Sequence, residues 1–137
     1  MTLAHSRRLA ITLLIAAALL ASSCGPGDRP SVAEWRPSWD QALEIIPPES
    51  ELDAPPSEAE CQEVLGALRD VRPELSPAPD DIIDATVGAW FTYAESTFFT
   101  CFRSVPSEDR VARAYDTLDR LREEVETAIS TAGAGDG

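Results

Sequence analysis

Residues 81–102, which read DIIDATVGAWFTYAESTFFTCF, define the element around which we expect the fold to form. On a helix of about 100° per residue, six apolar side chains share one side: Ile83, Val87, Trp90, Ala94, Phe98 and Cys101. Aromatic residues flank this stripe, so the apolar arc covers about half of the circumference. A helix with so broad an apolar face contacts two neighbours. We therefore predict that it is the central helix of a small all-α bundle.

A further helix is predicted on each side of this segment. Ser57 and Glu60 form an S-x-x-E capping box at the start of a helix over residues 57–71, and Pro73 ends it. Ser107 is a suitable cap for a third helix that ends near Thr131. The apolar stripes of these two helices are Cys61, Val64, Leu65 and Leu68 in one, and Val111, Tyr115, Leu118, Val125 and Ile129 in the other.

The first 24 residues have the pattern of an export signal. Arg7 and Arg8 supply a basic start without acids, residues 9–21 are apolar except for Thr12, and small residues lead to Cys24. A membrane-spanning helix is the alternative. It requires about 20 apolar residues, whereas Gly25 ends this shorter run.

Residues 19–24, LLASSC, resemble the lipobox of bacterial lipoproteins. The resemblance covers residues 1–24 only. It implies that residues 1–23 are a signal peptide and that Cys24 becomes the acylated first residue of the mature protein. Palmitate is a typical acyl group on such proteins, and several acyl chains hold a protein stably on a bilayer. The expected location is the cell envelope, with the membrane as the first partner through Cys24.

The composition excludes several classes of function. All 24 acids but only 9 of the 11 basic residues follow residue 23, so the mature charge is 9 − 24 = −15, which argues against binding to nucleic acid. The single histidine, His5, leaves with the signal, and this removes Ser-His and Cys-His nucleophiles and histidine metal sites. The acidic clusters at 80–84 and 123–126 are interpreted as a helix start and an exposed face. We predict no catalytic residue, metal or cofactor, and a protein that is not an enzyme.

Cysteine pairing sets the expected topology. Once Cys24 is lipidated, Cys61 and Cys101 remain, and an even number in an oxidising compartment indicates a disulfide. Two buried free thiols are the alternative. Because Cys61 is in the first turn of its helix and Cys101 in the last turn of the next, the bond requires an antiparallel pair. Residues 57–131 are therefore predicted to form an antiparallel three-helix bundle.

The remaining segments are predicted to lie outside the bundle. Residues 24–56 are rich in proline and acids, which predicts an extended tether. A short helix over residues 39–46, capped by Ser38, interrupts it and carries Trp39 beside Trp35. This strip either docks on the bundle or binds a partner, and Phe99, on the polar side of the central helix, is a further candidate contact. Residues 132–137 are predicted to be a flexible tail.

Two functions remain open from the sequence. The first is a non-enzymatic, lipid-anchored envelope protein whose acidic helical domain binds another envelope protein or contributes to assembly. The alternative is a lipoprotein that binds a small ligand or a cation, through its acidic surface or a pocket beside Trp90 and Tyr93.

Overall fold

The computed structural model describes residues 28–103 and 107–135 of the chain, and every regular element in these ranges is a helix. The predicted all-α class is confirmed, but four α-helices are present where three were predicted. They are α1 (Val32–Glu44), α2 (Glu58–Val71), α3 (Asp81–Arg103) and α4 (Glu108–Gly135), with short 3-10 helices η1 (Glu49–Glu51) and η2 (Arg72–Leu75). The signal segment and Cys24 lie outside the described residues.

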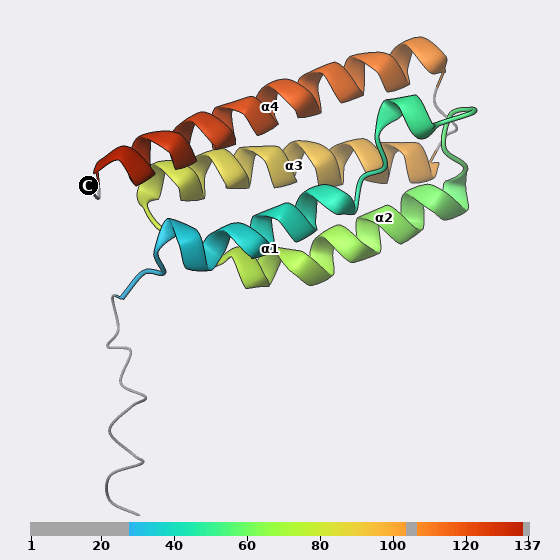
Figure 1. Ribbon diagram of the computed structural model, residues 1–137. Helices are drawn as coiled ribbons and strands as arrows, with labels where there is room; N and C mark the ends of the chain where they lie inside the picture. The colour runs from blue at the N-terminus through green and yellow to red at the C-terminus, as the bar shows by residue number, and fades with distance from the viewer. Residues whose placement is uncertain (1–27, 104–106, 136–137) are drawn as a thin grey trace, which may run out of the picture.

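The central position of α3 is confirmed. It packs most extensively against α2 and α4, which lie on opposite sides of it in Figure 1, while α1 contacts η2, α2 and α4. All six residues of its predicted stripe are buried: Ile83, Val87, Trp90, Ala94, Phe98 and Cys101. The ring of Trp90 also contacts Trp39 of α1, so the broad apolar arc of α3 serves three neighbours.

Helix α1 begins earlier than predicted and contains a proline. Its cap is Ser31, whose Oγ accepts from the Glu34 amide while the Glu34 carboxylate accepts from the Ser31 amide, and the predicted start at Ser38 is wrong. Pro37 inside the helix costs about 3 kcal/mol. Burial of an indole contributes roughly 4–6 kcal/mol from its area, and both Trp35 and Trp39 are buried, so tertiary packing outweighs the proline.

The predicted tether is therefore wrong over residues 31–46. Val32, Leu43, Ile45 and Ile46 pack against the buried cluster that contains Trp35. Two interpretations of this strip were open, docking on the bundle and binding of a partner. In the structure it docks on the bundle. The bundle therefore includes α1 and begins before residue 57, where the predicted three-helix bundle was expected to start.

The other helix ends follow local chemistry. The predicted capping box of Ser57 and Glu60 is present at the start of α2, and the Asp80 Oδ1 accepts from the Ile83 amide at 2.7 Å at the start of α3. Helix α4 continues to Gly135, past the predicted end at Thr131. Residues 132–135 are thus helical, where a tail was expected.

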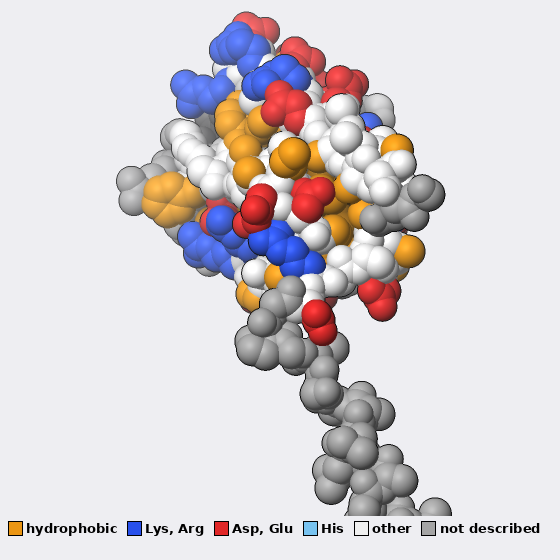
Figure 2. All heavy atoms as spheres, turned by 90° about the vertical axis from the view of Figure 1, so that its left-hand side faces the viewer, with side chains coloured by type: hydrophobic (Ala, Val, Ile, Leu, Met, Phe, Trp, Pro, Cys, Tyr) orange, Lys and Arg blue, Asp and Glu red, His pale blue; other side chains and the backbone are white. Residues whose placement is uncertain are grey.

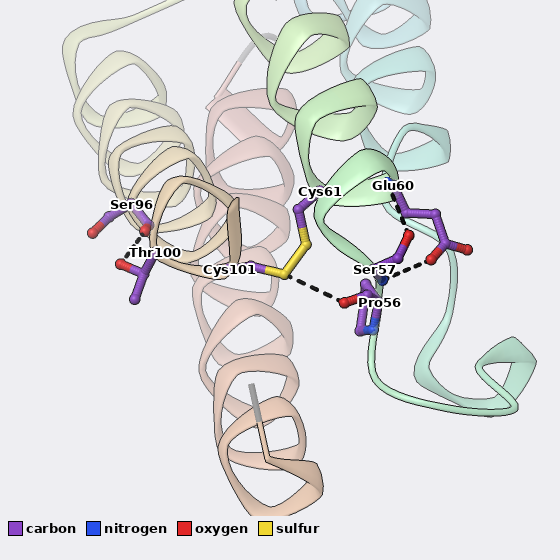
Figure 3. The surroundings of a disulfide bond; sticks show 7 residues. All are labelled: Pro56, Ser57, Glu60, Cys61, Ser96, Thr100 and Cys101. Carbon is purple, nitrogen blue, oxygen red and sulfur yellow. Dashed lines mark hydrogen bonds between the residues drawn. A yellow bond between two sulfur atoms is a disulfide. The ribbon is translucent and has the colours of Figure 1, made fainter. Parts of the chain in front are cut away.

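A disulfide joins Cys61 to Cys101, as predicted (Figure 3). The two Cα atoms are 6.0 Å apart, and the bond links the first turn of α2 to the last turn of α3. The Cys101 Sγ also lies 3.8 Å from the carbonyl oxygen of Pro56, the residue that leads into the cap of α2. In the described ranges, no helix combines the length and the apolar character needed to cross a membrane.

Removal of the disulfide should lower stability substantially. The bond closes a segment with a sequence separation of 40. The chain-entropy relation then gives about 4 kcal/mol of unfolding free energy. We expect the double variant Cys61→Ala/Cys101→Ala to lose about this amount in urea denaturation, and non-reducing mass spectrometry of the parent chain to yield a Cys61–Cys101 peptide. Recovery of two alkylatable thiols from the folded parent would contradict the bond.

Candidate functional site

Two of the three aromatic residues proposed for partner binding belong to the core. Trp35 is 3% exposed and Trp39 is fully buried. The indole N–H of Trp35 donates to the Leu75 carbonyl at 3.0 Å, and that of Trp39 donates to Glu126 Oε1 at the same distance. The expectation that these side chains contact a partner is corrected: their surfaces face the bundle, and their polar atoms are used there.

Phe99 has the position predicted for it. Its side chain is 38% exposed, and Ile82 is the other large hydrophobic residue exposed in the described chain. The two lie seventeen positions apart on the same helix, so they do not form one contiguous patch. Exposure of a single aromatic ring does not by itself define a site.

The acidic cluster at the start of α3 has structural roles. Asp80 caps the helix, and Asp81 forms an ion pair with Arg29 from the segment before α1. Figure 2 looks onto the end of the bundle at which α1 begins, and there acidic and basic side chains surround a group of hydrophobic ones. Charges of both signs are thus mixed at this end.

The second acidic cluster is divided by the fold. Glu126 is part-buried and accepts from Arg36 Nη1 at 2.7 Å and Nη2 at 3.2 Å, in addition to Trp39 Nε1. Glu124 pairs with Arg120 on the exposed face of α4. Glu126 therefore joins α4 to α1, a role that spacing along the sequence did not indicate. Within the described ranges, no group of three or more His, Cys, Asp or Glu side chains is placed to hold a metal ion.

One cavity of the described chain lies between the C-terminal half of α3 and the start of α4. We call it the α3–α4 pocket; its volume is about 320 Å³. Its apolar wall includes Phe98, Val111 and Ala114, next to the disulfide at Cys101. The polar residues on its lining are Tyr93, Ser96, Thr97, Thr100, Arg110, Arg113 and Tyr115.

A second cavity, the α1–α4 pocket, has a volume of about 370 Å³. It lies between the C-terminal end of α1 and α4, and Trp90 contributes to its wall. Tyr93 lines the other pocket, so the expected single pocket beside Trp90 and Tyr93 is replaced by two. Charges of both signs line this second cavity, from Glu49, Asp119 and Arg122.

Tyr115 lies on the lining of both pockets. Its hydroxyl donates to the Pro47 carbonyl at 2.9 Å, which connects α4 to the segment after α1. Burial raises the pKa of this phenol to about 12, with smaller contributions from the negative charges of Glu49 and Asp119. Tyr115 is thus a neutral structural donor at physiological pH.

Comparison of the chain with protein-family models, with curated proteins and with solved structures finds no match. The arguments about function therefore depend on the residues and their geometry.

Substitution of Glu126 should destabilise the bundle more than substitution of its neighbours. Glu126→Ala removes the acceptor of a buried indole N–H together with the partner of Arg36, and we expect a loss of about 2 kcal/mol of unfolding free energy. Glu126→Gln keeps an acceptor for Trp39 and should lose about 1 kcal/mol. The matched control is Glu123→Ala on the exposed face, with an effect within about 0.5 kcal/mol. Equal losses for the two alanine variants in urea denaturation would refute the role of Glu126.

Alkaline pH should destabilise the fold through Tyr115. The folded state holds the phenol proton more tightly than the unfolded chain, in which the pKa is 10.0. This contribution to stability is complete below about pH 10 and is lost as the pH rises toward 12. Urea denaturation at pH 9, 10 and 11 should show a fall in stability that is smaller in Tyr115→Phe.

Absorbance at 295 nm gives a direct measurement of the same phenol. The chain has two tyrosines, so Tyr93→Phe leaves Tyr115 as the only one. Its midpoint should lie near pH 12 in the folded variant. A midpoint near 10 in the folded state would contradict the effect of burial.

Proposed function

We propose that the protein is a non-enzymatic, lipid-anchored protein of the bacterial cell envelope whose helical bundle binds another envelope protein. The observation that carries the proposal is the Cys61–Cys101 disulfide, because disulfides form and persist in oxidising compartments outside the cytosol. The signal-like residues 1–23 and the lipobox-like LLASSC support the same location.

The start of α1 sets the distance between the anchor and the bundle. Six residues lie between Cys24 and the cap Ser31, so seven Cα–Cα steps separate the two (31 − 24 = 7). Fully extended, they span about 25 Å. Acylation of Cys24 would then hold the bundle next to the bilayer, with the end shown in Figure 2 nearest to it.

We further infer that successive helices of the bundle run in alternating directions. Three contacts support this order. The disulfide pairs the start of α2 with the end of α3, Trp35 near the start of α1 donates to Leu75 just after α2, and Tyr115 in the first half of α4 donates to Pro47 just after α1. Each contact places the beginning of one helix beside the end of another.

The net charge of the chain indicates the surface charge of the partner. With Trp35 and Trp39 in the core, exposed side chains have to make the contact, and the full chain carries a net charge of −13. Charge of one sign on a small domain favours association with a surface of the opposite sign and repels similar ones. We therefore expect a partner with a basic surface.

Chemical cross-linking in intact membranes tests this function. We expect a specific cross-linked species between the anchored chain and an envelope protein. The yield should fall as the ionic strength rises, because exposed charges are screened. Recovery of the monomer alone with cross-linkers of several chemistries would refute the binding role.

A Cys24→Ser variant is the control for the anchor. The parent should yield an N-terminal peptide that begins at Cys24 with the mass of its acyl chains, and the variant should yield no acylated peptide. Ser22→Ala, which keeps a small residue ahead of the cysteine, should be acylated like the parent. An unmodified Cys24 in the exported parent would refute the lipid anchor independently of the cross-linking result.

A further inference from the structure

We propose that the α3–α4 pocket is a binding site for a small anion with an apolar body, in which Arg110 and Arg113 bind the anionic head. This inference goes beyond the proposed function, because the site would take a small molecule and would operate with or without an envelope partner. The head is a carboxylate or a phosphate, and the experiment below distinguishes the two.

The size and the walls of the pocket suit the apolar part of such a ligand. A volume of about 320 Å³ falls at the lower end of the range for small-molecule sites, which is roughly 300–1,000 Å³. Phe98, Val111 and Ala114 supply an apolar wall from two different helices. The disulfide at Cys101 fixes the C-terminal end of α3 at this place, so one side of the pocket is held covalently.

The two arginines suit the anionic head. They are three positions apart on α4 and therefore share one face of the helix, at the lining of the pocket. Four arginines elsewhere form ion pairs, whereas among the described residues no carboxylate forms one with Arg110 or Arg113. In a chain with a net charge of −13, the described residues thus provide no acidic partner for these two guanidinium groups, which lie beside an apolar wall.

Local helix stability does not account for Arg110. It lies in the first turn of α4, where the partial positive charge of the helix start disfavours a basic side chain and favours an acid. The same helix start adds to the positive potential that an anion would experience. The position is thus unfavourable for the isolated helix and favourable for a helix with an anion beside it.

The α1–α4 pocket does not have these features. It has a similar volume, but Arg122 shares its lining with the acids Glu49 and Asp119. In the α3–α4 pocket both charged lining residues are basic. The anion is therefore assigned to the α3–α4 pocket.

Titration calorimetry on the acylated chain in nanodiscs of zwitterionic lipid tests the site, with empty nanodiscs as the blank. The probes share one apolar body: 4-phenylbutyrate, 4-phenylbutyl phosphate, 4-phenyl-1-butanol and 4-phenylbutylamine. We expect at least one anion to bind with a Kd below about 1 mM. The alcohol should bind about tenfold more weakly or worse, and the amine should show no binding. The ratio of the two anion affinities identifies the preferred head.

Three variants locate the binding. Arg110→Gln/Arg113→Gln should weaken binding of the anions about tenfold or more. The affinity for the alcohol should not change, because the substitution removes exposed charges without loss of packing. Arg69→Gln/Arg122→Gln is the matched control, with the same change in net charge at two other unpaired arginines, and should bind like the parent. Ala114→Leu fills the pocket and should abolish binding of every probe.

Two results would overturn the proposal. One is the absence of binding by both anions at concentrations up to about 10 mM. The other is anion binding that Arg110→Gln/Arg113→Gln leaves unchanged in a chain with the melting temperature of the parent. Because the two arginine substitutions are at exposed positions, this second readout does not depend on whether Ala114→Leu folds.

Discussion

One side chain, the indole of Trp39, joins three of the four helices: its own helix α1 and the two long helices α3 and α4. The ring is fully buried, stacks on Trp35 with centroids 6.3 Å apart, and meets Trp90 of α3 edge-on at 5.1 Å. Its N–H donates to Glu126 of α4. One residue of α1 therefore contacts both long helices and satisfies its polar atom in the same place. The geometry meets the requirement that a buried donor has a partner, and the ring supplies a large apolar area that a bundle of this size needs.

The parts of the fold that follow from local pattern were predictable. The period of the apolar residues in α3, the capping box of Ser57 and the pairing of Cys61 with Cys101 each depend on a few neighbouring residues or on a count. The start and extent of helix α1 were missed, and only a shorter helix over residues 39–46 was predicted, because composition was given more weight than pattern. Seven prolines between residues 25 and 56 indicate a tether, and Pro37 opposes a helix, yet Ser31 and Glu34 form the same S-x-x-E box that identified α2. Local propensity favours an extended segment here and does not include the packing energy of the two indoles. That packing energy makes the helix the more stable conformation.

The candidate site was less predictable for a related reason. A pocket depends on which helices meet and on their rotation, and no spacing along one helix specifies this. The sequence placed Trp90 and Tyr93 on one helix and suggested a shared pocket, whereas in the structure they line two different cavities. Arg110 and Arg113 were visible as a basic pair three positions apart, but only the neighbouring wall from α3 distinguishes them from other exposed arginines. In the same way, the role of Glu126 depends on the packing of α1 against α4, and the sequence did not indicate which helix the Trp35–Trp39 strip would contact.

The covalent loop from Cys61 to Cys101 encloses α2 and α3 and leaves α1 and α4 outside it. If the chain is anchored at Cys24, any pull on the far side of the bundle passes first through α1, whose attachments are all non-covalent: the indole contacts, the Trp35–Leu75 hydrogen bond and the Arg36–Glu126 pair. The disulfide does not attach α1 to the rest of the bundle, because both of its cysteines follow α1 in the chain. Helix α1, the element nearest the membrane, would then be the first to detach under force. Its detachment would lengthen the spacer, while the cross-linked pair of α2 and α3 keeps its shape.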